Sequence, residues 1–413
     1  MKRVIVAAVA LLALAGCTSS TTGRGDTASG SAPSSAPQTL TGSPIPASTT
    51  VTPPASSPAP PTSAPPVPRS GPLNGFLVAD LTFVGTQGWA LGTVGCTQSS
   101  GRCTALAHTT NNGRTWRSIT PPPVHVRIPD LDSGGCAAPC VGAVRFATPA
   151  IGYLFGGGAS GALLMTKDGG AHWQREPGDA VALESLDGNV IRINDNGCDP
   201  PGCRYTAQLA KIASTSWQPA ALPGSPRSAT VGAALARSGS HAYLAAFGHT
   251  AGGAGDARST LWTSTDDGHH WSNRGEPCPQ GKHEVDSTAL TTAPDGTLVV
   301  LCQDRQTSQK FVAVSTDGGS DFATGSRKAL GAATAVIGAG SAHDILASSD
   351  DTYRSTDGGH HFSRLGSNGG SSAGALGWLG FASSTVAHAV SVDHRTIWFT
   401  TDGGTSWRAG RLR

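Results

Sequence analysis

The sequence is poor in charged residues: Asp, Glu, Lys and Arg make up 14% of its 413 residues, and the formal net charge is only +2. It has no cluster of Lys and Arg and no stripe of basic residues interleaved with aromatics, so nucleic acid is not expected as a partner. Sustained helical spacing of apolar residues is also missing, which excludes a mainly helical protein. Glycine is abundant, with 55 residues, and this composition is typical of a turn-rich β protein.

The apolar run Val4–Leu14 is too short to span a membrane stably. It follows the positive residues Lys2 and Arg3 and leads directly into Leu14-Ala15-Gly16-Cys17. This arrangement resembles the signal peptide and lipobox of bacterial lipoproteins. The resemblance implies removal of residues 1–16, diacylation of the Cys17 thiol, and a mature protein held by its lipid at the extracytoplasmic side of the cell membrane. The alternative is an ordinary secretory signal followed by a chance cysteine.

Residues 17–72 form the next segment, which after Cys17 consists almost entirely of Ser, Thr, Pro, Ala and Gly. Such a composition cannot bury enough apolar surface to offset the entropy of ordering, so this segment is expected to be a disordered stalk. In a polyproline II conformation it could extend on the order of 150 Å, at about 3.1 Å per residue. Residues 73–413 are expected to form the globular domain.

The globular part contains a repeated eight-residue motif that ends in an aromatic residue. Six copies are recognisable: TTNNGRTW at Thr109–Trp116, TKDGGAHW at Thr166–Trp173, STDDGHHW at Ser264–Trp271, STDGGSDF at Ser315–Phe322, STDGGHHF at Ser355–Phe362 and TTDGGTSW at Thr400–Trp407. A degenerate seventh copy, ASTSW, ends at Trp217. The terminal aromatics are 40 to 57 residues apart, which is the length of a four-stranded propeller blade. The sequence therefore predicts an all-β, seven-bladed β-propeller of four-stranded antiparallel blades.

The motif resembles the Asp-box, or BNR repeat, of sialidases, sortilin-type receptors, xyloglucanases and photosystem II assembly-factor-like propellers. Its carboxylate is suited to accept backbone N–H groups across the hairpin of the two outer strands, and its glycine to adopt a positive φ. We therefore expect a structural role for the Asp-box carboxylates Asp168, Asp266, Asp317, Asp357 and Asp402. The histidine pairs in these turns invite a metal-site hypothesis, but they lie on different blades, too far apart to share one ion. Neither a metal site nor a cofactor is expected.

Cysteine usage points to the face of the propeller opposite the Asp-boxes. Once Cys17 is lipidated, eight cysteines remain, an even number that favours four disulfides in an oxidising compartment. Short spacing suggests the pairs Cys96–Cys103, Cys136–Cys140 and Cys198–Cys203, with Cys278–Cys302 by remainder, although eight cysteines allow 105 connectivities. Each of these pairs would lie in a loop or connection on the face opposite the Asp-boxes.

The same face is predicted to carry the longest irregular insertions, among them residues 120–142, 194–204 and 276–286. Long loops held on a rigid scaffold are common binding sites. The candidate ligand-face residues in these insertions are His125, Arg127, Asp130, Asp132, Asp199, His283 and Glu284. The alternative is that the disulfides only protect exposed loops from proteolysis.

Two enzyme classes are alternatives to a binding role. Val126-Arg127-Ile128-Pro129 resembles an arginine-bearing signature of sialidases, but it follows the first Asp-box instead of preceding it, and the sialidase family has six blades. A xyloglucanase-like glycosidase needs two carboxylates across a cleft and aromatic platforms, and no tryptophan lies in a predicted ligand-face loop. No catalytic residue is assigned. The sequence favours a monomeric, surface-anchored binding or scaffolding propeller for an extracytoplasmic protein or glycan, with a sialidase-like or xyloglucanase-like glycoside hydrolase as the alternative.

Overall fold

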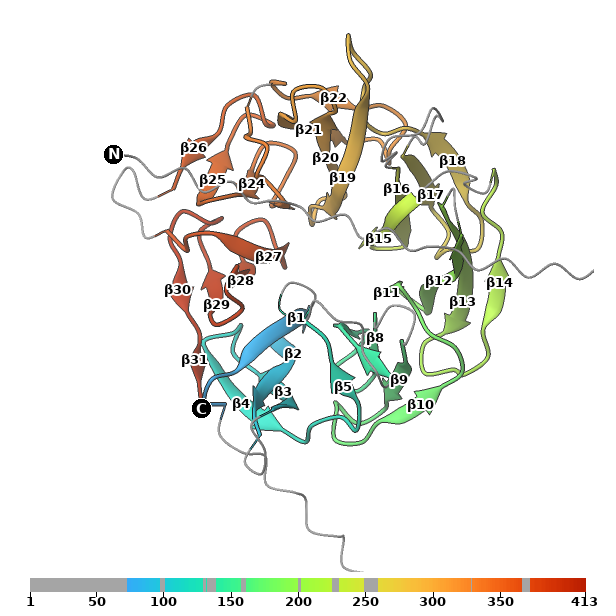
Figure 1. Ribbon diagram of the computed structural model, residues 1–413, viewed down its shortest axis with the longest axis vertical. Helices are drawn as coiled ribbons and strands as arrows, with labels where there is room; N and C mark the ends of the chain where they lie inside the picture. Colours follow the sequence, from blue (N-terminus) through green and yellow to red (C-terminus); the bar gives the residue numbers. More distant parts are fainter. Residues whose placement is uncertain are drawn as a thin grey trace, which may run out of the picture. The chain divides into compact units, whose positions relative to one another are not determined.

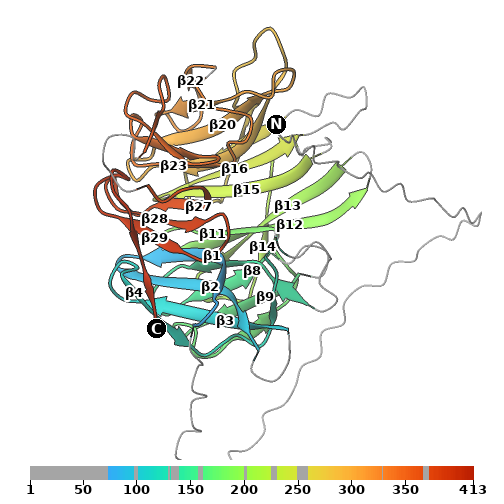
Figure 2. The same ribbon diagram turned by 60° about the vertical axis from the view of Figure 1, so that its left-hand side comes forward.

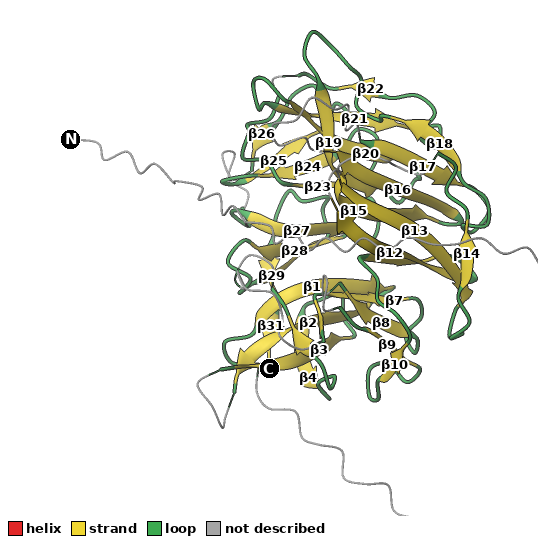
Figure 3. Cartoon of the chain, turned by 45° about the vertical axis from the view of Figure 1, so that its right-hand side comes forward, coloured by secondary structure: helices red, strands yellow, loops and turns green. Residues whose placement is uncertain are grey.

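The computed structural model describes residues 73–96, 101–128, 131, 139–156, 161–199, 202–224, 230–248, 259–327, 329–365 and 372–413. Cys17, the expected stalk, Asp130, Asp132 and Cys136 lie outside these residues. The described part of the chain contains strands and no helix (Figure 3). Seven of its sheets are arranged in a ring as blades (Figure 1), and β5 and β6 form a separate two-stranded sheet. The predicted seven-bladed, all-β propeller is confirmed.

Each blade takes four consecutive strands, with the first innermost and the fourth outermost. Blade 1 contains β1 (Leu77–Val84), β2 (Gln87–Gly95), β3 (Arg102–Thr109) and β4 (Thr115–Ile119). Blade 2 contains β7 (Ala143–Phe146), β8 (Gly152–Phe155), β9 (Leu163–Thr166) and β10 (Gln174–Glu176), and blade 3 contains β11 (Ala182–Ser185), β12 (Asn189–Asp199), β13 (Gly202–Lys211) and β14 (Gln218–Ala220). Blade 4 contains β15 (Thr230–Ser238), β16 (His241–Gly248), β17 (Thr260–Ser264) and β18 (Ser272–Gly275).

The remaining blades follow the same order. Blade 5 contains β19 (Val285–Thr292), β20 (Leu298–Asp304), β21 (Lys310–Ser315) and β22 (Ala323–Thr324). Blade 6 contains β23 (Val336–Ala339), β24 (Ile345–Ser348), β25 (Thr352–Ser355) and β26 (Ser363–Arg364). Blade 7 contains β27 (Leu376–Phe381), β28 (Ala387–Ser391), β29 (Ile397–Thr400) and β30 (Arg408–Ala409). Three short strands lie outside this scheme: β5 (His125–Val126), β6 (Cys140–Val141) and β31 (Arg411–Leu412).

The second and third strands of a blade are apolar on both faces because each blade is covered by a neighbour on either side. In β8, β9 and β24 every residue is buried, so these strands read as continuous apolar runs instead of alternating patterns. Aromatic rings fill the space between blades. The ring of Trp89 in β2 stacks on Phe146 of the next blade, with centroids 3.8 Å apart, and its Nε1 donates to the carbonyl of Gly169.

The Asp-box turns share one hydrogen-bond pattern. In blade 2, Asp168 Oδ1 accepts the Thr166 hydroxyl at 2.8 Å and the backbone N–H of His172 at 2.9 Å, while Thr166 Oγ1 accepts the N–H of Gly170 at 3.0 Å. The carboxylates of Asp266, Asp317, Asp357 and Asp402 make the equivalent bonds. Asn111 replaces the aspartate in blade 1 and keeps the bond from the backbone, here Thr115 N–H, at 3.0 Å.

These turns and the hairpins between the first and second strands lie on the same face of the propeller. In blade 2 the N–H of Gly169 donates to the carbonyl of Ala150, which precedes β8. Blades 1, 4, 6 and 7 contain the equivalent bond between their Asp-box turn and their first hairpin. We call this the Asp-box face. The inner strands therefore end at the Asp-box face, and their first residues lie toward the opposite face.

The structure corrects one prediction about the opposite face. Residues 194–204 were expected to be an irregular insertion, but β12 and β13 extend through most of this range as an antiparallel ladder that reaches the pair Asp199 and Gly202. Cross-strand pairing continues beyond the blade, with an irregularity between Asp195 and Cys198, and it satisfies backbone N–H and C=O groups that an irregular loop would leave to water. Figure 2 shows these strands extending past their neighbours.

The ring closes between blade 7 and blade 1 through the end of the chain, which runs from β30 through Gly410 into β31. β31 pairs in parallel with β4, with Arg411 opposite Thr115, so blade 1 has a fifth strand at its outer edge. Nearer the channel, His394 of blade 7 accepts the N–H of Val78 through its carbonyl and donates from Nδ1 to the Val78 carbonyl, both at 2.8 Å. We call this junction the seam.

Candidate functional site

Two of the predicted disulfides are present in the described residues, both toward the face opposite the Asp-boxes. Cys96–Cys103 joins the end of β2 to β3, and Cys278–Cys302 ties the connection between blades 4 and 5 to β20. Cys140 is also disulfide-bonded, and its predicted partner Cys136 lies outside the described residues. Cys198 and Cys203 are paired in the β12–β13 ladder, but their side chains are not described.

The predicted ligand-face residues whose side chains the structure describes lie on different blades. His125 lies in β5 and lines a groove of about 840 Å³ between blades 1 and 2, together with Pro121–Pro123 and the Cys96–Cys103 disulfide. Arg127 follows β5, and its backbone N–H donates to Val141. His283 and Glu284 lie on blade 5. Asp199 is described only by its backbone position in β12.

His283 and Glu284 each contact a charged residue within blade 5. His283 Nδ1 is 3.0 Å from Asp304 Oδ2, and Glu284 Oε2 is 2.7 Å from Arg305 Nη1. Arg305 also pairs with both carboxylate oxygens of Asp286, at 2.6 and 2.7 Å. A ligand that used Glu284 would have to compete with Arg305 for its carboxylate, so the role of Glu284 in ligand binding stays a prediction.

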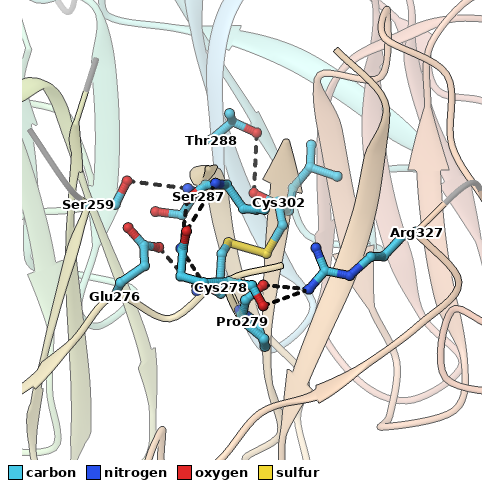
Figure 4. The surroundings of a disulfide bond; sticks show 11 residues. Ser259, Glu276, Cys278, Pro279, Ser287, Thr288, Cys302 and Arg327 are labelled. Carbon is cyan, nitrogen blue, oxygen red and sulfur yellow. Dashed lines mark hydrogen bonds between the residues drawn. A yellow bond between two sulfur atoms is a disulfide. The ribbon is translucent and has the colours of Figure 1, made fainter. Parts of the chain in front are cut away.

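Beside this network, Glu276 is a carboxyl group held next to the Cys278–Cys302 disulfide (Figure 4). Its Oε1 accepts the backbone N–H of Cys278 at 3.0 Å, and Ser259 also hydrogen-bonds to the carboxyl group. Burial raises the pKa of Glu276 to about 8, and the nearby carboxylate of Asp286 adds to the increase. Glu276 is therefore mainly protonated at neutral pH. Its neighbours are hydrogen-bonding groups and a disulfide, and none of them is assigned a catalytic role.

The raised pKa of Glu276 predicts a loss of stability at alkaline pH. Its stabilising contribution is complete below the unfolded pKa of about 4.5 and is lost as pH rises through the folded pKa of about 8. We expect the free energy of unfolding to fall by about 2–4 kcal/mol between pH 5 and pH 9 from this group. Glu276→Gln should reduce that fall, whereas Asp187→Asn, at an exposed turn, should not. Urea titrations at both pH values test this, and equal pH dependence in wild type and Glu276→Gln would refute it.

A different cavity lies at the centre of the ring. It has a volume of about 420 Å³ and is lined by the ends of the inner strands β1, β7, β11, β15, β19 and β27. The hairpin residues Gly239, Pro294 and Ala382 also line it. Because inner strands end at the Asp-box face, this cavity occupies the Asp-box end of the central channel. We call it the channel cavity.

Three charged side chains form one wall of the channel cavity. Glu184, the third residue of β11, is placed between Arg145 of β7 and Arg237 of β15. Its Oε2 is 3.2 Å from Arg145 Nε, and its Oε1 is 3.2 Å from Arg237 Nε. Glu184 is buried, whereas the side chains of Arg145 and Arg237 are 25% and 38% exposed. Both carboxylate oxygens are thus engaged by guanidinium groups. We call these residues the charged wall.

Asp80 lies close to this wall but does not line the cavity. Its Oδ2 accepts the backbone N–H of Val144 at 2.9 Å, so it joins β1 to β7. Burial raises the pKa of Asp80 to about 6, against the opposing influence of Arg145 and of the hydrogen bond from Val144. The carboxyl group therefore serves as an inter-strand acceptor whose charge varies near neutral pH.

Aromatic side chains form the other wall. Phe83 at the end of β1 and Trp378 and Phe381 of β27 line the cavity, and we call them the aromatic wall. The ring of His388 stacks on Phe83 with centroids 3.5 Å apart and donates from Nε2 to the carbonyl of Asn112. Burial lowers the pKa of His388 to about 4, so this side of the cavity carries no charge at neutral pH.

Residues 1–18 match the family model of the prokaryotic membrane lipoprotein lipid attachment site. The chain carries such a site. In the described residues no helix is long and apolar enough to cross a membrane, and no group of three or more His, Cys, Asp or Glu side chains is placed to hold a metal ion. No curated protein gives a significant match to the sequence.

Solved propellers are similar to this chain at low identity. YCF48 from Cyanidioschyzon merolae is 14% identical, with 82% of this chain and 95% of that one covered and a TM-score of 0.49. YCF48 bound to D1 peptide is 17% identical, with coverages of 80% and 92% and a TM-score of 0.47. A GH74 xyloglucanase from Xanthomonas campestris is 14% identical, with coverages of 80% and 72% and a TM-score of 0.38. No function is carried over from them.

The charged wall was not among the sequence-based candidates. Its members lie in short apolar segments, within Val144-Arg145-Phe146, Leu183-Glu184-Ser185 and Ala236-Arg237-Ser238. Each charged residue interrupts an inner strand just before a hairpin. An alignment of the seven inner strands on their hairpins would have placed all three at the same level of the channel, and this is the signal that could have identified them.

Proposed function

We propose that this lipid-anchored protein is a non-catalytic binding or scaffolding module, and that the channel cavity is its ligand site. The observation that supports this most directly is the construction of the cavity: six blades contribute to a space of about 420 Å³ with a charged wall and an aromatic wall. Ligand sites are commonly concave spaces of this size into which a few polar groups converge. The Ser, Thr and Pro-rich segment 17–72 would act as the stalk between the lipid and the propeller.

The state of Glu184 favours binding over hydrolysis. A glycosidase needs two carboxyl groups flanking the scissile bond, one to donate a proton and one to act as nucleophile or base. Glu184 is the only carboxylate that lines the channel cavity among the described residues, and two arginines engage its oxygens. The ligand we expect is a protein segment or a glycan outside the cytoplasm.

A variant that blocks the cavity tests this function. Ala382 is exposed and lines the cavity rim, so Ala382→Trp should obstruct entry without disturbing the core. The full lipidated chain, in detergent, would be applied to peptide and glycan arrays. We expect the arrays to contain ligands that bind the wild type and that bind Ala382→Trp more than tenfold more weakly. Ala409→Trp, on the exposed outer strand of the same blade, is the control and should bind these ligands as the wild type does. Specific binding that both variants retain would place the site elsewhere.

The glycoside hydrolase alternative has its own test. We expect 4-methylumbelliferyl sialoside and xyloglucan oligosaccharides to be turned over at background rates by the wild type and by Arg127→Ala alike. Turnover above background that Arg127→Ala or Glu184→Gln abolishes would instead establish the enzyme.

A further inference from the structure

The arginines of the charged wall retain hydrogen-bonding capacity that the propeller does not use. Their Nε atoms lie 3.2 Å from the carboxylate oxygens of Glu184, and no described residue accepts a hydrogen bond from the Nη nitrogens of Arg145 or Arg237. Both side chains are partly exposed and line the channel cavity. A guanidinium group presents its N–H donors in a planar fork that matches a carboxylate. The free Nη groups thus provide two such forks at one cavity wall.

The balance of charge on this wall favours an anion. Two guanidinium groups and one carboxylate leave a single excess positive charge among the groups that line the cavity. Asp80 reduces this excess when it is ionised, but it is buried and tied to Val144 N–H outside the cavity lining. Partial desolvation in the channel strengthens the attraction between a guanidinium and an entering anion compared with bulk water.

The aromatic wall limits what the anion can be attached to. Phe83, Trp378 and Phe381 are each partly exposed in the cavity, and Leu290 of blade 5 also lines it. This wall offers area for burial, worth about 25 cal/mol for each Å² removed from water, and few donors or acceptors for hydroxyl groups. Hydroxyl groups that faced this wall would be left unpaired, whereas an aromatic or aliphatic body would be buried against it.

We propose that the channel cavity binds a carboxylate borne on an apolar body, with Arg145 and Arg237 contacting the carboxylate and the aromatic wall contacting the body. This inference rests on the proposed binding function and specifies its ligand class. The carboxylate can come from a free aromatic or aliphatic acid or from the carboxyl end of a peptide. In this proposal Glu184 holds the two guanidinium groups apart and lowers the affinity of the site for anions.

The test compares an acid with its uncharged amide. The full lipidated chain in lipid nanodiscs would be titrated with 3-phenylpropionate and 3-phenylpropionamide by saturation-transfer difference NMR, against empty nanodiscs. We expect the acid to bind at least tenfold more tightly than the amide. Arg145→Gln and Arg237→Gln should each weaken binding of the acid at least tenfold, and Arg408→Gln, on the outer strand β30, should not change it. Thermal unfolding verifies that each variant is folded. If Arg145→Gln does not fold, the result for Arg237→Gln, which changes the more exposed arginine, decides the test.

Glu184→Gln separates a ligand site from a purely structural ion pair. Loss of its negative charge should raise the affinity for the acid about threefold or more, whereas an ion pair that only joins the blades would give lower stability and no gain in affinity. Equal binding of acid and amide, both blocked by Ala382→Trp, would overturn this inference but leave the proposed function standing. Absence of any binding by either probe, or tighter binding of N-acetylneuraminate than of 3-phenylpropionate, would also overturn this ligand class. The peptide and glycan arrays test the proposed binding function separately.

Two peptides distinguish the sources of the carboxylate. Acetyl-Gly-Gly-Phe with a free carboxyl end should bind more tightly than 3-phenylpropionate if the ligand is a peptide end, and its amidated form should then lose at least tenfold. Exclusion of both peptides while the free acid binds would assign the site to small carboxylic acids. Either result supports the carboxylate and apolar-body chemistry.

Discussion

Gly359→Ala is expected to destabilise the propeller by about 3 kcal/mol or more, although the change adds a single methyl group. Gly359 has a φ of +88°, and a Cβ built there would lie 2.0 Å from Val312 Cγ2 of blade 5. The variant therefore combines a left-handed backbone conformation that is unfavourable for alanine with a collision between neighbouring blades. The free energy of unfolding from urea or thermal denaturation measures the effect.

The adjacent glycine supplies the matched control. Gly358 also has a positive φ, +71°, but a Cβ there would meet only the Ala342 carbonyl oxygen, at 3.3 Å. Gly358→Ala should therefore cost about 1 kcal/mol, which is the backbone contribution without the collision. If the two variants were equally stable, the close packing of this Asp-box turn against blade 5 would not be the reason for its glycine.

Removal of the Cys278–Cys302 disulfide is expected to cost about 4 kcal/mol. The bridge closes a sequence separation of 24 residues, for which loss of the constraint on the unfolded chain alone gives about 3.5 kcal/mol. Both cysteines are almost completely buried, so replacement by alanine also removes packing in the core. The double variant Cys278→Ala and Cys302→Ala, unfolded in urea beside the wild type, provides the measurement.

The Cys96–Cys103 bridge is the comparison for this prediction. Its sequence separation is only 7, and the same reasoning gives about 2.5 kcal/mol. The double variant Cys96→Ala and Cys103→Ala should therefore lose less stability than the variant at Cys278 and Cys302. The reverse order would mean that loop length and burial do not set the contribution of these bridges.

The fold could be predicted because its signals are local. Each Asp-box places a hydroxyl, a carboxylate and a glycine within five residues, as in Thr166, Asp168 and Gly170, and the hydrogen bonds among them need no distant partner. Counting such turns gave the number of blades, including one whose turn at Trp217 has lost the aspartate. The Cys96–Cys103 bridge was similarly accessible through its short spacing along the chain.

The channel cavity could not be read in the same way because its groups come from distant parts of the sequence. Arg145, Glu184 and Arg237 meet only after three blades have packed around the channel, and each one alone resembles a solvent-facing charge in a strand. Loop length and cysteine content drew the prediction toward the opposite face, where His125 and His283 are held on different blades. The closing strand β31 has only two residues, too few for any periodic pattern.

The seam gives the channel cavity two sides that differ mechanically. The charged wall belongs to blades 2, 3 and 4, which follow one another along the chain, whereas the aromatic wall belongs to blades 1 and 7, which meet at the seam. The stack of Phe83 on His388 and the bond from His388 to Asn112 both cross that junction. A body resting on Phe83 and Trp378 together would contact both blades of the seam, so occupancy of the channel and resistance of the seam to opening would rise together.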